Sequence, residues 1–152
     1  MSENVSVTVP SVTISLTTKD SNEALDFYAK GFEAVELYRL PSPDGGIAHA
    51  EMAIKGTKIY ISDEDDDFKA YAMPEGAMAS CLFSVESGNC DEDYERAIAA
   101  GATSLSAPED QFYGARTAIV LDPFGYRWCF VQVIEVISDE EVAKRAQELF
   151  GG

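Results

Sequence analysis

One histidine and a nearby carboxylate are the side chains best suited to acid–base chemistry. His49 is the single histidine of the chain, and an imidazole titrates close to neutral pH. Glu51 follows two residues later, so on a strand the two side chains would share one face. They are therefore candidates for a proton-transferring base and the carboxylate that orients it. The alternative, which the sequence favours, is a histidine that is hydrogen-bonded in or beside a sheet without a chemical role.

A second candidate lies in the segment that contains Tyr113 and Arg116. A guanidinium beside a tyrosine and a flexible glycine can clamp a carboxylate or a phosphonate, and it would be an island of positive charge in an acidic protein. The alternative is an ion pair between Arg116 and Glu109, Asp110 or Asp122.

The three cysteines, Cys81, Cys90 and Cys129, are not arranged as a CxxC motif. Their odd number favours reduced thiols in a cytoplasmic protein. Cys129 would be a nucleophile only with a base beside the sulfur, and nothing in the sequence places His49 there. A buried, inert thiol is the simpler expectation.

Charge excludes several classes of partner. The net charge is -16 at pH 7, which disfavours binding to nucleic acid and to anionic membranes. The first ten residues do not resemble a signal peptide, and no segment approaches the ~20 apolar residues needed to span a bilayer. We therefore expect a cytoplasmic protein.

The elements that would position these residues repeat along the chain. Alternating and helical patterns predict two successive units of the order strand, helix and three strands. The first unit is predicted to contain strand 11–17, a helix over 23–30 that ends at Gly31, and strands 35–40, 47–54 and 57–62. The second is predicted to contain strand 79–85, helix 90–100, and strands 103–107, 116–121 and 126–133. Gly56 aligns with Gly125 and Tyr60 with Cys129, each 69 residues apart.

The predicted fold class is α+β, with two βαβββ units whose open sheet faces form a cleft, plus a C-terminal helix. The units cover residues 10–63 and 78–135 approximately, within one domain of residues 1–137. Residues 138–152 form the added helix, and Ser138 with Glu141 fits a capping box. The acidic run 63–67 lacks the spacing of a calcium loop and is expected to be a solvated linker.

Three motifs resemble a known family. Residues 26–34 (DFYAKGFEA) are similar to its first helix end, Gly101-Ala102 to its second, and residues 122–128 (DPFGYRW) to its DPxGxxW turn. Over about residues 10–135 the chain resembles the vicinal-oxygen-chelate superfamily of glyoxalases, bleomycin-resistance proteins and dioxygenases. Residues 46–50 and 112–116 resemble its phosphonate-operon-associated (PhnB-like) branch.

The resemblance implies a metal-binding position near the start of each unit's first strand and on its last strand. These positions are occupied by Thr13, Tyr60, Ser80 and Cys129. Zinc, iron and manganese prefer imidazole and carboxylate donors, which this set lacks. We therefore expect no metal and no other cofactor, and a cleft lined by hydroxyls, a tyrosine and a thiol.

The sequence therefore predicts a metal-free small-molecule-binding protein of this superfamily, similar to its drug-sequestering members. The ligand would contact Thr13, Tyr60, Ser80, Tyr113, Arg116 and Cys129. Two alternatives remain open. One is an isomerase- or lyase-type enzyme that uses His49 and Glu51 or a divalent metal, and the other is a purely structural or interaction module. Because members of the superfamily usually pair, we expect a homodimer.

Overall fold

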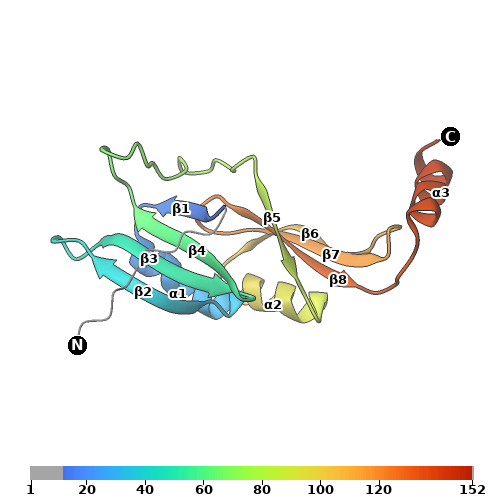
Figure 1. Ribbon diagram of the computed structural model, residues 1–152, viewed down its shortest axis with the longest axis horizontal. Helices are drawn as coiled ribbons and strands as arrows, with labels where there is room; N and C mark the ends of the chain where they lie inside the picture. The colour runs from blue at the N-terminus through green and yellow to red at the C-terminus, as the bar shows by residue number, and fades with distance from the viewer. Residues whose placement is uncertain (1–11, 152) are drawn as a thin grey trace, which may run out of the picture.

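The chain folds into two βαβββ units followed by a helix, as the repeat predicts (Figure 1). The computed structural model describes residues 12–151; Ser11 and the predicted start of the first unit lie outside them. The first unit contains β1 (Ile14–Thr18), α1 (Ser21–Phe32), β2 (Val35–Pro41), β3 (Ile47–Ile54) and β4 (Thr57–Asp63). The second contains β5 (Leu82–Glu86), α2 (Cys90–Ala100), β6 (Thr103–Asp110), β7 (Ala115–Leu121) and β8 (Arg127–Val133), and α3 (Asp139–Phe150) follows.

The two units form sheets of the same topology. The strand orders are β1-β4-β3-β2 and β5-β8-β7-β6, with the first and last strand of each unit parallel. Ile14 pairs with Ile59 in the first sheet, and Phe83 pairs with Trp128 in the second. Because both residues of the second pair lie 69 positions after those of the first, the predicted repeat is confirmed.

The end of α1 differs from its prediction. The helix continues past Gly31 to Phe32, and Glu33 caps it in the left-handed conformation at φ 55°. Gly31 is buried against α2, where an added Cβ would lie 3.1 Å from the Cβ of Ala100. The glycine therefore permits close packing of the two helices and does not end the helix. At the start of α1, Asp20 accepts a hydrogen bond from the Glu23 amide, which confirms it as the N-cap.

A single aromatic core joins the units. Phe32 of α1 lies with its ring 5.0 Å from that of Trp128 and 5.4 Å from that of Phe130, both on β8. Phe27 and Tyr28 extend the cluster, and all five side chains are buried. Trp128 and Phe130 therefore both face the helices. The first unit's helix therefore packs against the second unit's sheet, and the two units share one core.

The predicted turn between β7 and β8 is anchored by a buried carboxylate. One oxygen of Asp122 accepts hydrogen bonds from the amides of Phe124 (2.9 Å) and Tyr126 (3.0 Å). The other accepts one from Trp128 Nε1 at 2.9 Å and one from the Tyr28 hydroxyl. Burial raises the pKa of Asp122 above its ordinary value, although these hydrogen bonds lower it. The turn is thus tied directly to α1.

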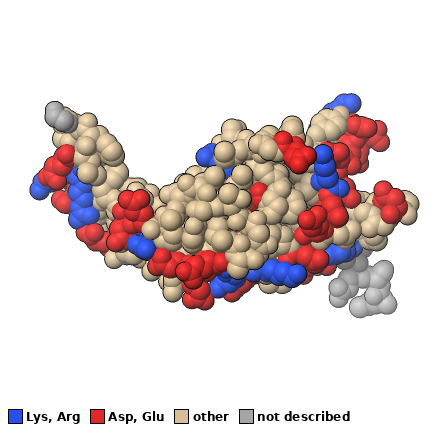
Figure 2. All heavy atoms as spheres, turned by 180° about the vertical axis from the view of Figure 1, so that it is seen from behind, with Lys and Arg blue, Asp and Glu red and all other residues tan. Residues whose placement is uncertain are grey.

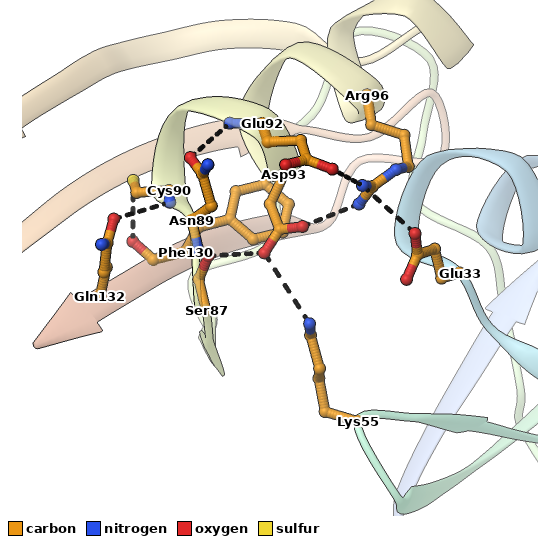
Figure 3. Close-up of polar contacts among 10 residues, drawn as sticks. All are labelled: Glu33, Lys55, Ser87, Asn89, Cys90, Glu92, Asp93, Arg96, Phe130 and Gln132. Carbon is orange, nitrogen blue, oxygen red and sulfur yellow. Dashed lines mark hydrogen bonds and ion pairs between the residues drawn. The ribbon is translucent and has the colours of Figure 1, made fainter.

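A charged network joins the units on the other side of the helices (Figure 3). The buried Asp93 of α2 accepts hydrogen bonds from the Ser87 hydroxyl (2.5 Å) and from Arg96 (2.7 Å), and Lys55 of the β3–β4 turn lies 3.9 Å away. Arg96 also pairs with Glu33 at the end of α1, at 3.2 Å. The contacts from Lys55 and Glu33 therefore link the first unit to α2 of the second.

The C-terminal helix stands away from this body (Figure 1). None of its residues is buried, and Ser138 caps it by accepting from the Glu141 amide, as predicted. Arg145 ties it back through Glu135 (2.6 Å) and the Phe112 carbonyl (3.1 Å). Within residues 12–151, no helix combines the length and the apolar character that a membrane crossing requires.

Candidate functional site

The open face of the first sheet carries a cluster of aromatic and charged side chains. His49 and Glu51 of β3 lie beside Tyr60 of β4, because Glu51 and Tyr60 are register partners. The His49 ring lies 4.9 Å from that of Tyr60 and 6.3 Å from that of Tyr38, which is about half exposed. His49 Nε2 lies 3.2 Å from Glu51 Oε2. The strand period thus brings these two side chains into contact; their catalytic role stays a prediction.

A lysine that the sequence analysis did not single out completes this cluster. Lys58 Nζ lies 3.0 Å from Glu51 Oε1. Its hydrogen bond is the main cause that lowers the pKa of Glu51, and the bond from His49 lowers it further. Glu51 is therefore a carboxylate at neutral pH, suited to orienting the imidazole. Lys58 precedes Tyr60 by two residues on one strand, so strand parity was the signal that could have found it.

The open face of the second sheet mixes apolar and polar side chains, such as Ile119 and Val131 with Ser84 and Arg127. Cys129 is buried and pairs with Ser84 on one side and Ile119 on the other. Burial raises the pKa of its thiol, which keeps it protonated at neutral pH. Cys129 is therefore not an activated nucleophile. Leu82 is exposed at the start of β5.

Thr13 and Ser80, which were also predicted to line the cleft, lie outside the strands. The predicted strand 79–85 begins only at Leu82, so Ser80 precedes β5, where its carbonyl accepts a hydrogen bond from Arg127 at 2.8 Å. Thr13 precedes β1, and its hydroxyl is buried without a hydrogen-bond partner among the described residues. The β5 side chain beside Cys129 is that of Ser84, so the structure does not place Ser80 next to Cys129 on the sheet.

Arg116 is held by two carboxylates. Its guanidinium donates to Asp110 at 2.9 Å, an ion pair that the sequence had offered as an alternative, and to Asp91 of α2 at 3.0 Å. These hydrogen bonds raise the pKa of Arg116. Tyr113 is exposed, with its ring 5.2 Å from that of Phe112. A ligand anion at Arg116 would have to compete with both carboxylates, and binding there stays a prediction.

The donors on the open face do not fit a divalent metal. Across residues 12–151, no three side chains of His, Cys, Asp or Glu are grouped so that they could hold a metal ion. His49 and Glu51 supply two donors, and the Lys58 ammonium already occupies the second oxygen of the carboxylate. Such a set lacks the three or four ligands of a protein metal centre.

Comparison with known proteins places the chain in a family. The model of the Glyoxalase/Bleomycin resistance protein/Dioxygenase superfamily matches residues 11–130, and the chain belongs to that superfamily. It is 34% identical over 136 residues to the uncharacterized protein Rv0887c of Mycobacterium tuberculosis, covering 88% of this chain and 80% of that protein.

Two solved structures share the fold. The first is TioX from Micromonospora sp. ML1, with a TM-score of 0.65, 24% identity and coverage of 80% of this chain and 96% of that one. The second is the fosfomycin resistance protein FosX from Listeria monocytogenes, with a TM-score of 0.60, 21% identity and coverage of 90% and 99%. At these identities the likeness concerns the fold alone.

Proposed function

We propose that this protein binds a small amphipathic, aromatic molecule on its open sheet faces without a metal, and that it does so in the cytoplasm. The observation that carries the proposal is the cluster of Tyr38, His49 and Tyr60, which presents partly exposed aromatic side chains on one sheet face. Aromatic rings bind planar and cationic ligands by stacking and cation–π contact. The net charge of -16, with acidic side chains spread along the surface (Figure 2), favours a cationic ligand further.

We further propose that two copies enclose the ligand. The two sheets of one chain follow one another along its long axis (Figure 1), so an opposed second wall would come from another chain. A homodimer would supply that wall and bury more of the ligand. The superfamily is named in part for bleomycin resistance, and FosX is named for resistance to fosfomycin. These names support a drug-like compound as the ligand of this chain.

Equilibrium dialysis with 9-aminoacridine, a planar cation at neutral pH, tests the proposal. We expect saturable binding by protein that elemental analysis shows to hold no stoichiometric metal. Tyr60→Ala should weaken binding about fivefold, because stacking on one aromatic ring contributes on the order of 1 kcal/mol. Tyr71→Ala is the matched control, since Tyr71 is exposed in the linker between the units. Equal loss in both variants, or one zinc or iron per chain, would overturn the proposal.

A second candidate function is proton transfer by the His49–Glu51 pair. The 3.2 Å contact between the two side chains favours it, because a base needs a group that fixes its orientation. Deuterium incorporation next to the carbonyl of a 2-oxo acid or aldehyde substrate in D2O would reveal such an activity. His49→Ala should then abolish exchange while ligand binding persists. If exchange at the wild-type rate persists in His49→Ala, the histidine is not the base.

A further inference from the structure

A second candidate site lies away from the open sheet faces. A cavity of about 470 Å³ opens between the linker that joins the units, the start of α1 and the turn between β7 and β8. Its walls come from residues 18–20 and 23, 72–77 and 121–125, with Thr103 at the side. This volume falls within the range of pockets that hold drug-sized molecules. The residues of the aromatic cluster on β3 and β4 are not among its walls.

One wall of the cavity is apolar. It consists of Met73, Pro74, Leu121, Pro123 and Phe124. Because proline has a fixed φ, Pro74 and Pro123 lose little conformational freedom when a ligand binds.

The linker is held over the turn by backbone contacts. The Ala79 amide donates to the Gly125 carbonyl at 2.8 Å. Gly125 has φ 94°, and an added Cβ would lie 2.9 Å from the Ala77 carbonyl oxygen and 3.0 Å from Met73 Cβ. Only glycine therefore fits here, and the close approach brings residues 72–77 against the turn to close the cavity.

The polar side of the cavity is acidic. Asp20, Glu23 and Glu75 line it together with one cation, Lys19. The Asp20 carboxylate uses one oxygen to cap α1. Among the described residues, neither Glu23 nor Glu75 forms a side-chain ion pair. The Asp20 carboxylate also offsets the partial positive charge at the N-terminus of α1. The remaining surplus of negative charge favours a positively charged ligand over a neutral or anionic one.

We propose that this cavity binds a small organic cation with a compact apolar body. The apolar body would contact the wall around Phe124, and the charged group would face Glu23 and Glu75. This site is independent of the binding proposed for the open sheet faces: it needs neither aromatic stacking nor a second copy of the chain.

Three adamantane derivatives of matched shape test the proposal by calorimetry and amide NMR. 1-Adamantylamine is a cation at neutral pH, 1-adamantanol is neutral and 1-adamantanecarboxylate is an anion. We expect the amine to bind one equivalent per chain, at least tenfold more tightly than the carboxylate. Its amide shifts should centre on residues 72–77 and 121–125. The double variant Glu23→Gln, Glu75→Gln removes both acidic side chains. It should weaken binding of the amine about fivefold or more and leave binding of the alcohol unchanged.

Two control variants separate this site from general electrostatics and from the other proposed site. Glu140→Gln with Glu148→Gln makes the same change of net charge on α3 and should leave binding of the amine unchanged. Tyr60→Ala should also leave it unchanged. The proposal is overturned if the three compounds bind equally, if both pairs of charge variants weaken the amine alike, or if the amide shifts centre on β3 and β4.

Discussion

Replacing Asp122 by asparagine tests the reasoning about the shared core most directly. This side chain is 3% exposed and accepts four hydrogen bonds. Asparagine keeps the shape but offers one oxygen only. If that oxygen serves the amides of Phe124 and Tyr126, the new amide group meets Tyr28 and Trp128. The Tyr28 hydroxyl can turn to accept, but the indole N–H of Trp128 cannot.

The expected cost follows from this count. One buried hydrogen-bond donor without a partner costs about 1–3 kcal/mol. A hydrogen bond to a charged acceptor contributes about 1.5–3 kcal/mol, whereas one to a neutral acceptor contributes about 1 kcal/mol. We therefore expect Asp122→Asn to lower the free energy of unfolding by about 2–4 kcal/mol. Tyr28→Phe removes one donor and leaves three, so it should cost about 1–2 kcal/mol.

Urea unfolding followed by Trp128 fluorescence measures these changes, because Trp128 is the only tryptophan and is buried. Asp67→Asn makes the same chemical change on an exposed linker residue and should alter stability by less than about 0.5 kcal/mol. If Asp122→Asn is no more destabilising than Asp67→Asn, the turn is not anchored by its carboxylate.

The pH dependence of Asp122 has a defined sign. Burial raises the pKa of this carboxyl in the folded protein. Its contribution to stability is therefore fully present below the unfolded pKa of about 3.9 and is lost as the pH rises through the folded value. On acidification from neutral pH through this window, the wild type should gain stability relative to Asp122→Asn. A difference between the two proteins that stays constant with pH would contradict this assignment.

Three further predictions concern single groups. Burial raises the pKa of the Cys90 thiol to about 11. Iodoacetamide at pH 8 should therefore alkylate the exposed Cys81 first. Mass spectra in which Cys90 is alkylated at the same rate as Cys81 would contradict this. Ser138→Ala removes the cap of α3 and should cost that helix about 1 kcal/mol; its amides should exchange faster without a change in global unfolding, because α3 buries no residue. Lys58→Ala should raise the pKa of Glu51 in an NMR titration, since Lys58 is the main cause of its lowering; an unchanged titration would exclude that ion pair.

The fold was predictable because its signals are local. Alternation along strands and helical spacing depend on residues a few positions apart, and the 69-residue repeat fixed which strands correspond. The N-cap Ser138 was confirmed, since a cap is recognised from its own sequence. Two errors arose where local and distant effects compete. Gly31 resembled a helix end but serves the contact between helices, and the strand expected from residue 79 begins at Leu82.

The sequence by itself determined the βαβββ repeat, the contact between His49 and Glu51 through strand parity, and an acidic protein with one histidine. Only the tertiary structure decided which groups meet across the units. It packs Phe32 on the second sheet, brings Lys55 to Asp93, and forms an open cavity between the linker and the turn at Gly125. The physical reason is that period and capping act within one element, whereas these contacts depend on how two whole units pack together.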